Sequence, residues 1–333
     1  MNHRGHAVKE KTSQSTWNQA QTVPKFTQKI INEEEIPLRS KSFSPETVDT
    51  VLRYGAVVGS VIEQHSKISR GAEWSRQLIH ATEEKNESFH SGTVILADEM
   101  SHSKGRFKRP WHAPKGGLWM TLVLVNTLLP ESSLLLPMAA GVACCEVLRH
   151  YGLEAHIKWV NDTLVDNRKI SGILTETFAG PKFGEEYILI GIGINVNNDQ
   201  FPAEFSETAI SMKSCLKREI NLNEVIARLL VKLRWNIGLL FYEEGRHLEK
   251  HGGIAIRNET ESESLPEDEH LLLKSYKSLT DIFNRRVLFG FDVQESPQFE
   301  ATVIGLDNTG GLILEMVDSS RIVQHSGEII YLD

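Results

Sequence analysis

Residues 155–176 read AHIKWVNDTLVDNRKISGILTE, and this stretch decides the fold. Apolar residues dominate 155–159 and 170–175, and the segment between them is rich in Asn and Asp. Such runs predict two strands, and the Asn/Asp cluster is typical of a tight polar turn. A third apolar run, 187–194, follows closely. Because these strands are joined by short turns, they predict an antiparallel or mixed sheet.

Lys158 lies where the first of these strands enters the turn. A lysine at the end of an apolar strand is partly removed from water, and a cation there normally has an anionic partner. That partner is either a bound ligand or Asp162, which would pair with Lys158 across a hairpin while Asn161 supplies turn geometry. The residues alone favour neither alternative.

Residues 191–197, Gly-Ile-Gly-Ile-Asn-Val-Asn, end the third strand. Glycines inside a strand usually mark a place where another group approaches the backbone. The pattern superficially resembles a dinucleotide-binding loop, but the third glycine is missing and no helix follows at once. A ligand or a second strand lying against Gly191 and Gly193 is the better interpretation.

Residues 104–111, Lys-Gly-Arg-Phe-Lys-Arg-Pro-Trp, precede a further strand prediction at 118–125. Glycine lets backbone N–H groups approach an oxyanion closely, and arginine supplies planar, forked donors, so the segment is typical of an anion site. A solvated basic loop is the ordinary alternative. Three such segments in one domain together favour a site for a nucleotide and a small acid.

The rest of the chain divides around this sheet. Residues 1–45 are polar and predict a flexible N-terminal extension without a winged helix. The acidic stretch 250–274 predicts a linker between a larger domain at 46–249 and a small β-barrel-like domain at 275–333. Other predicted elements are a helix at 45–54 with Ser44 as its N-cap, strands at 57–62 and 93–97, and helices at 74–82, 136–151 and 221–244.

Composition excludes several function classes. A net charge of −8 gives no bulk attraction for nucleic acid, and DNA binding is not expected. Three cysteines are too few for a disulfide framework or a zinc site, and Cys144 and Cys145 are expected to pack inside a helix. Neither a signal peptide nor a membrane span is predicted, so a cytoplasmic location is expected. Serine-hydrolase, zinc-helix and Walker motifs are absent from the sequence.

Three segments, in matching order and spacing, resemble the signatures of the biotin protein ligase family. They are 158–162 (KWVND), 168–176 (RKISGILTE) and 191–197 (GIGINVN). Residues 284–287 (NRRV), 305–312 (GLDNTGGL) and 326–329 (SGEI) resemble that family's SH3-like C-terminal domain, so the similarity covers about residues 55–333. The resemblance implies an α+β fold, with a mixed seven-stranded sheet backed by helices, as in class II aminoacyl-tRNA synthetases, plus a small SH3-like β-barrel.

The resemblance also implies a reaction. Family members form the adenylate of biotin from ATP and pass the acyl group to a lysine of a carboxyl-carrier protein. The motif lysine bridges the acid's carboxylate and the α-phosphate, which assigns that role to Lys158. A fixed cation offsets the repulsion between these anions and stabilises the charge that grows in the transition state. Arg106 and Arg109 match the arginines of the family's phosphate-binding loop.

Further nucleotide contacts carry over by position. They are Lys104, Gly105, Trp111, Asn161, Asp162, Gly172, Gly191, Gly193 and Asn195. Magnesium is expected to arrive with ATP and to lie near Asn195, with no cage of protein ligands. The expected partner is a carboxyl-carrier domain, and binding to DNA or to a membrane is not expected. The sequence does not decide whether the protein forms a homodimer.

The acid side departs from the family pattern. Where the family loop has Gln-x-x-Gly-Arg-Gly-Arg-x-Gly-Arg, residues 100–109 read MSHSKGRFKR, and where the family has Ser-Thr-Asn against the vitamin's ring, Arg70-Gly71-Ala72 stand instead. Arg70, Gly71 and Met100 therefore mark a substrate pocket that has lost polar contacts, and we expect weaker acid binding than in relatives with the full pattern. Three hypotheses follow: a biotin ligase with a diverged pocket, a ligase for another acid such as lipoate, or a non-catalytic binding or regulatory homologue.

Overall fold

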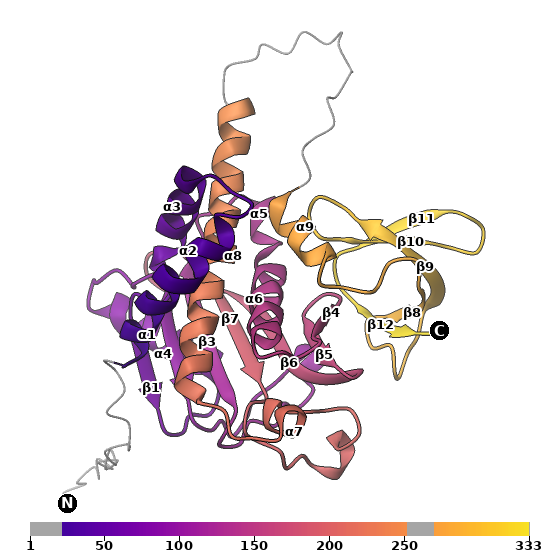
Figure 1. Ribbon diagram of the computed structural model, residues 1–333, viewed down its shortest axis with the longest axis horizontal. Coiled ribbons are helices and arrows are strands. Elements are labelled where there is room, and N and C mark those ends of the chain that lie inside the picture. The colour runs from indigo at the N-terminus through magenta and orange to yellow at the C-terminus, as the bar shows by residue number, and fades with distance from the viewer. Residues whose placement is uncertain (1–21, 252–269, 333) are drawn as a thin grey trace, which may run out of the picture.

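The computed structural model describes residues 22–251 and 270–332. Its larger part is built on a seven-stranded mixed sheet with the order β1-β2-β3-β7-β6-β5-β4 (Figure 1). Only β1 and β2 run parallel within this sheet, and its other neighbours are antiparallel. The strands are β1 (Ile62–His65), β2 (Thr93–Ala97), β3 (Leu118–Val125), β4 (His156–Lys158), β5 (Asp162–Val165), β6 (Arg168–Ala179) and β7 (Glu186–Ile194).

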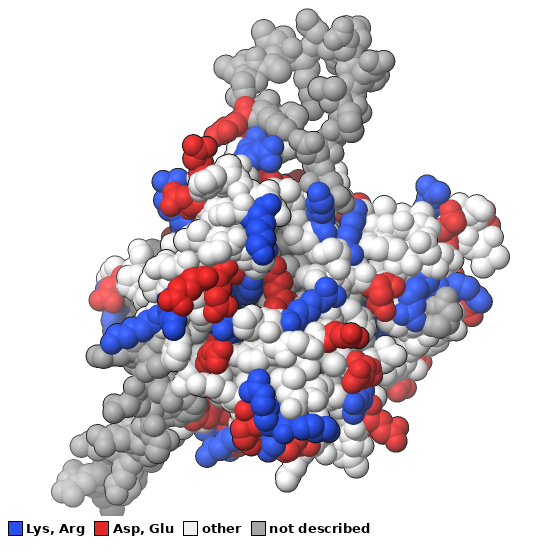
Figure 2. Space-filling model, viewed as in Figure 1, with Lys and Arg blue, Asp and Glu red and all other residues white. Residues whose placement is uncertain are grey.

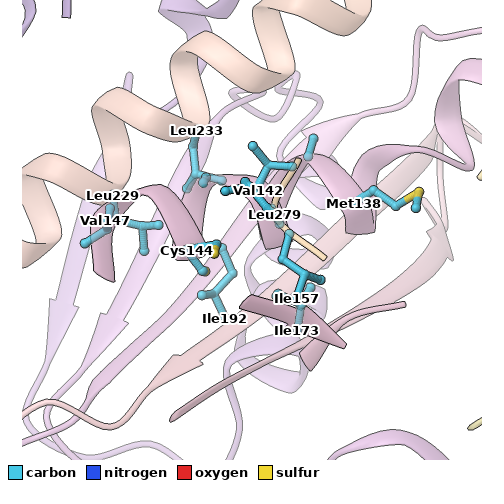
Figure 3. Close-up of a cluster of buried hydrophobic side chains, with 14 of the residues drawn as sticks. Met138, Val142, Cys144, Val147, Ile157, Ile173, Ile192, Leu229, Leu233 and Leu279 are labelled. Atoms are coloured by element: carbon cyan, nitrogen blue, oxygen red, sulfur yellow. The ribbon is translucent and has the colours of Figure 1, made fainter. Parts of the chain in front are cut away.

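Helices cover both faces of the sheet. The main core lies between the sheet and the helices α6 (Leu136–His150) and α8 (Leu222–His251), and Figure 3 shows side chains of both helices meeting Ile157, Ile173 and Ile192 from the strands. A smaller apolar cluster lies under α4 (Gly71–Glu84) on the other face. The predicted sheet with helical layers is therefore confirmed.

Helix α6 is the most apolar element of the core. Together with α5 (Pro130–Ser133) it forms a stretch, Pro130–His150, that is long and apolar enough to cross a membrane by composition, yet 67% of its most apolar window is buried inside the protein. Cys144 and Cys145 are fully buried in this helix, and burial raises the pKa of both thiols to about 12. The two cysteines therefore act as packing residues, as predicted.

The C-terminal part contains a separate antiparallel sheet with the order β11-β10-β9-β8-β12. Its strands are β8 (Arg286–Gly290), β9 (Phe299–Leu306), β10 (Leu312–Glu315), β11 (Arg321–Gln324) and β12 (Glu328–Tyr331), preceded by α9 (Leu271–Lys277). In the hairpin after β9, the Asp307 carboxylate accepts hydrogen bonds from the backbone N–H groups of Thr309 and Gly311 at 2.9 and 2.7 Å. The Trp159 indole donates to the carbonyl of Gly310 at 3.2 Å, which ties this hairpin to the larger sheet.

The flexible extension predicted over residues 1–45 is wrong for its second half, while residues 1–21 lie outside the described part. The chain is helical through α1 (Thr22–Ile30), the π-helical turn Ile31–Glu35 and α2 (Ile36–Arg39). Val23, Ile30 and Ile31 are buried and α1 packs on α8. These apolar residues have helical spacing, but the intervening charges hide it in the sequence.

The start of the next helix confirms its predicted cap. α3 (Pro45–Tyr54) begins after Ser44, whose hydroxyl accepts a hydrogen bond from the Thr47 N–H at 3.2 Å. Likewise, α8 begins after Asn221, whose side chain accepts hydrogen bonds from the N–H groups of Asn223 and Glu224 at 3.1 and 3.4 Å. In both cases a short polar side chain satisfies N–H groups that the first helical turn leaves free.

Other boundaries differ from the predictions. The strand expected at 57–62 is a 3₁₀ turn, Gly55–Val57, followed by β1 from Ile62. Strand β5 occupies the middle of the predicted turn and leaves a turn on each side of it, at residues 159–161 and at Asp166–Asn167, where φ is 50° and 58°. Residues 252–269 of the predicted linker lie outside the described part, and α9 occupies its end. The short elements Arg106–Lys108, Ala203–Phe205 and α7 (Met212–Leu216) complete the described secondary structure.

A buried ionic cluster attaches the N-terminal helices to the core. Glu35 is 1% exposed, and its carboxylate lies 2.8 Å from Arg39 Nε and 2.6 Å from Lys232 Nζ. Arg39 also contacts Glu146 of α6 at 2.8 Å. Charges this deeply buried are stable only while each keeps its partners.

Replacing Glu35 by Ala should lower the free energy of unfolding by about 3 kcal/mol, because two buried cations lose their shared carboxylate. Urea denaturation followed by circular dichroism measures the change. Glu33→Ala is the matched control, since Glu33 is 63% exposed and lies 3.8 Å from Lys29. Equal stability of the two variants would contradict the assigned role of the cluster.

Candidate functional site

A cleft of about 860 Å³ opens where the sheet, the N-terminus of α4 and the C-terminal domain meet. The structure brings every site residue predicted from the sequence to the walls of this cleft. They are Arg70, Gly71, Met100, Lys104, Gly105, Arg106, Arg109, Trp111, Lys158, Asn161, Asp162, Gly172, Gly191, Gly193 and Asn195. Segments far apart in the chain thus form one site.

The floor of the cleft is set by strand register. Lys158 pairs with Asp162, Asp162 with Gly172, and Gly172 with Gly193 across four neighbouring strands. The paired glycines leave this part of the sheet without side chains. A Cβ atom added at Gly193 would lie 2.9 Å from the Trp111 ring, and one at Gly172 would lie 3.2 Å from it. The close approach predicted at Gly193 is therefore made by an aromatic ring of the same chain.

Trp111 lies on this floor with its polar edge unsatisfied. Its ring meets Trp119 edge-on at 6.3 Å between centroids, and the Lys169 ammonium lies 5.2 Å from its centroid. The indole Nε1 and the Ser103 hydroxyl are both buried, and neither has a hydrogen-bond partner within residues 22–251 and 270–332. A buried donor without a partner costs about 1–3 kcal/mol, so both groups are suited to bind a polar ligand atom in the cleft.

Lys158 faces the cleft without an ion pair to any residue in the described ranges. Burial lowers the pKa of its ammonium group, and the nearby Asp162 carboxylate only partly offsets this effect. Asp162 itself is bound by Lys169 at 2.7 Å. The sequence left open whether Lys158 pairs with Asp162 or with a ligand, and this arrangement favours a ligand because the carboxylate has another partner.

The loop 103–111 is folded over the cleft. The Gly105 N–H donates to the Arg109 carbonyl at 2.9 Å, and the Trp111 N–H donates to the Ser103 carbonyl at 3.1 Å. Phe107 and Lys108 have φ values of 54° and 62°. Lys108 occupies the position at which the resemblance places a glycine, so a lysine here adopts the left-handed conformation that favours glycine, at a cost of about 1–2 kcal/mol.

The two predicted phosphate-loop arginines have different partners. Arg106 donates to the Asn161 side chain at 3.3 Å and to the Gly327 carbonyl at 2.8 Å. Burial lowers the pKa of Arg106, and Glu328 and Asp162 only partly offset this. Arg106 is thus fixed in the wall of the cleft and lacks a carboxylate bound directly to its guanidinium among the described residues.

Arg109 is instead bound by the C-terminal domain. Its guanidinium meets both carboxylate oxygens of Glu328 at 2.8 and 2.9 Å and lies 2.5 Å from Asp292. Although burial alone lowers the pKa of Arg109, these hydrogen bonds and charges raise it overall. The sequence did not predict this contact, because local pattern says nothing about which distant carboxylates meet a loop.

The acid end of the cleft contains an ion pair. Arg70 directly precedes α4, and its guanidinium is hydrogen-bonded to Glu176 of β6. Glu176 belongs to a recognised motif but had no predicted role. Since Gly172, Leu174 and Glu176 alternate along β6, they share the cleft face of the sheet, and this period of two is the signal that could have identified Glu176.

Asn195 is the residue that the sequence placed near magnesium. It is 4% exposed, and its side-chain oxygen accepts a hydrogen bond from Asn198 at 2.9 Å. No group of three or more His, Cys, Asp or Glu residues that could hold a metal occurs in the described ranges. Asn195 can therefore offer at most one further lone pair and its amide donors to a ligand.

Gly193→Ala should disturb the packing of Trp111 and Trp119, because the added methyl group would lie 2.9 Å from the Trp111 ring. We expect a clear loss of near-ultraviolet circular dichroism from the coupled indoles. Gly191→Ala is the control, since its Cβ would meet only the Leu174 carbonyl at 3.4 Å. Unchanged spectra for Gly193→Ala would contradict the glycine floor.

Comparison with known proteins agrees with this geometry. The sequence model of the biotin/lipoate A/B protein ligase family matches residues 73–195. The bifunctional ligase/repressor BirA of Bacillus spizizenii is 31% identical over 240 residues, which is 71% of this chain and 65%, just under two thirds, of that protein. BirA of Bacillus subtilis is 28% identical over 275 residues, 80% of this chain and 74% of that protein.

Solved structures show the same fold. The biotin protein ligase from Aquifex aeolicus, solved in complex with biotin and ATP, matches with a TM-score of 0.61 at 19% identity. The match covers 82% of this chain and 98% of the Aquifex chain. The sequence matches lead to one conclusion: over residues 73–195 the chain belongs to the biotin/lipoate A/B protein ligase family.

Proposed function

We propose that this protein is an ATP-dependent biotin protein ligase. In the first step it forms biotinyl-5'-AMP, and in the second it transfers biotin to a lysine of a carboxyl-carrier protein. The observation that carries the proposal is Lys158, a partly buried ammonium group that faces the glycine-floored cleft without an ion pair to a described residue. Relatives named as ligases, and a matching fold that holds biotin and ATP, support it.

The first step needs two anions to meet. A carboxylate oxygen of the acid attacks the α-phosphorus of ATP, a phosphorus–oxygen bond forms, and the bond to the departing pyrophosphate breaks. In this proposal Lys158 contacts both the carboxylate and the α-phosphate, and Arg106, which also lines the cleft, adds a second cation. A preorganised cation stabilises charge in such a site more than in water, because it needs no reorganisation during the reaction.

The other cleft residues have supporting roles in this proposal. Asn161 fixes Arg106, and Lys169 holds Asp162 and so leaves Lys158 open to the ligand. The unsatisfied Trp111 N–H and Ser103 hydroxyl offer donors to the nucleotide or the acid. Magnesium would enter bound to the phosphates, and its charge would lower the repulsion between the two anions, with Lys104, Gly105, Gly191 and Asn195 lining the space around them.

In the second step the acceptor lysine attacks the carbonyl carbon of the adenylate. A carbon–nitrogen bond forms, AMP leaves, and the amine loses a proton. The proposed acceptor is the carboxyl-carrier domain of a biotin-dependent carboxylase or decarboxylase, because two relatives are named biotin–[acetyl-CoA-carboxylase] ligases. A cytoplasmic location fits this partner.

DNA binding is not part of the proposal, although the Bacillus relatives are named as repressors as well as ligases. The net charge is −8, and Figure 2 shows basic and acidic side chains intermixed over the face it displays. Such a surface gives no bulk attraction for a polyanion. A tight, salt-resistant shift of operator-like DNA would overturn this part.

Two alternatives remain beside the proposal. A ligase for another acid, such as lipoate, would use the same Lys158 chemistry with a different pocket end. One observation favours a non-catalytic homologue. Arg109 is bound by Glu328 and Asp292, so its guanidinium is already paired within the protein before any phosphate arrives. Pyrophosphate exchange measured with biotin, lipoate and octanoate separates all three, because a non-catalytic homologue shows exchange with none.

Lys158→Ala should lower the rate of biotin-dependent ATP–pyrophosphate exchange at least about 100-fold, since it removes about 3 kcal/mol of transition-state stabilisation. Far-ultraviolet circular dichroism should show an unchanged fold. Lys182→Ala is the matched control, because Lys182 binds the Asn86 side chain at an exposed position and does not line the cleft. Wild-type exchange in a folded Lys158→Ala protein would remove Lys158 from the reaction.

A further inference from the structure

The far end of the acid pocket is fixed by the geometry of β6. Gly172 of β6 pairs with Asp162 of β5, which in turn pairs with Lys158 of β4. Glu176 lies four residues beyond Gly172 on the same face of β6. At roughly 3.3 Å per residue, Glu176 is about 13 Å along the strand from Gly172. An acid whose carboxylate contacts Lys158 therefore directs its other end toward Glu176 and Arg70.

The wall between these two ends is small and apolar. Ala72, Met100 and Leu174 line it, and Gly191 adds no side chain. A chain of methylene groups fits such a wall, since it buries apolar area without leaving polar groups unpaired. Beyond this wall, the far end again presents polar groups.

The far end presents donors and acceptors side by side. Arg70 and Glu176 are 18% and 24% exposed and hydrogen-bonded to one another, and both line the cleft. A guanidinium has five N–H donors and a carboxylate has about four acceptor sites, so each retains hydrogen-bonding capacity beyond this contact. Helix α4 also begins here without a side-chain cap, which leaves N–H groups of its first turn available near Gly71 and Ala72.

We propose that the Arg70–Glu176 pair determines specificity by reading an uncharged end group that both accepts and donates hydrogen bonds, such as the cyclic urea of biotin. The Arg70 guanidinium donates to the carbonyl oxygen of the urea, and the Glu176 carboxylate accepts from its N–H. This inference rests on the proposed function for the orientation of the acid. The sequence predicts a pocket that has lost polar contacts, whereas this inference gives the pocket a new pair of polar contacts at Arg70 and Glu176.

Other end groups fit this pair less well. An alkyl or dithiolane end would remove water from the ion pair without offering hydrogen bonds, which is unfavourable for partly buried charges. A urea matches both partners and leaves the pair intact. The lipoate and fatty-acid alternatives are therefore disfavoured by the chemistry of the pocket end.

Arg76 provides an internal control. It contacts the other carboxylate oxygen of Glu176 at 3.2 Å, is 26% exposed, and is not among the residues that line the cleft. Arg70 and Arg76 thus both form ion pairs with one carboxylate, the Arg70 contact being the shorter, but of the two only Arg70 lines the cleft. A purely structural role predicts similar effects when either is removed.

The test is calorimetric titration of the full chain, with a non-hydrolysable ATP analogue, against biotin, desthiobiotin and octanoate. Desthiobiotin keeps the urea ring but lacks the thioether ring. Wild type should bind biotin and desthiobiotin at least about tenfold more tightly than octanoate, as expected for hydrogen bonds to charged groups. Arg70→Leu should abolish this preference, and Arg76→Leu should retain it within about threefold.

Arg70→Lys serves as a second variant in case Arg70→Leu does not fold, and it should also weaken the preference because lysine lacks the forked donors. Equal binding of octanoate and desthiobiotin by wild type, no binding of any acid, or equal loss in the Arg76 and Arg70 variants would overturn the inference. Selective binding without pyrophosphate exchange would instead refute the proposed function alone. If the wild-type protein catalyses pyrophosphate exchange with biotin, and Arg70→Leu still prefers biotin and desthiobiotin over octanoate, the inference is refuted and the proposed function stands.

Discussion

The pairing of Gly172 with Gly193 between β6 and β7 is the constraint on which the site depends. Because neither residue has a side chain, the sheet presents bare backbone at this level, and Trp111 lies directly on it. The same register places Asp162 and Lys158 on the next two strands and Glu176 further along β6. A shift of one residue would turn Glu176 to the opposite face of the sheet, so the register fixes both ends of the cleft at once.

The charges of the cleft are mostly matched within the protein. Arg109 is held by carboxylates of the C-terminal domain, Lys169 by Asp162, and Arg70 by Glu176. Lys158 and Arg106 are different, because burial lowers the pKa of both and no described residue forms an ion pair with either. An incoming anion therefore finds two cations in the cleft that have no carboxylate partner. The C-terminal domain is part of this balance, since Glu328 binds Arg109 while Gly327 binds Arg106.

The sequence predicted those features that depend on local pattern. Strands 93–97 and 118–125 match β2 and β3 at both ends, because continuous apolar runs are bounded there by turn residues. Ser44 is predicted as a helix cap from the residues that follow it, and its hydroxyl accepts a hydrogen bond from the Thr47 N–H. All of the predicted site residues line one cleft because the motifs end neighbouring strands, although their individual roles stay predictions.

Features that depend on distant contacts were not predictable in the same way. The N-terminal helices are held by a buried cluster around Glu35 whose partners come from α6 and α8, and charged residues at these positions indicate a solvated segment when seen locally. The Arg109 contact with Glu328 joins residues more than two hundred positions apart. At Arg70, comparison with the family pattern indicates only that polar contacts to the acid have been lost. The structure shows that the Arg70 guanidinium is hydrogen-bonded to the Glu176 carboxylate.

The central claim is that this cleft joins a carboxylate to AMP, and trapping the adenylate tests it most directly. The full chain would be incubated with ATP, magnesium and biotin in the presence of hydroxylamine, which attacks an acyl-adenylate to give a hydroxamate and AMP. The account predicts biotinyl hydroxamate and AMP in equal amounts, accumulating through many turnovers and depending on ATP. A folded protein that forms neither product with biotin would contradict it.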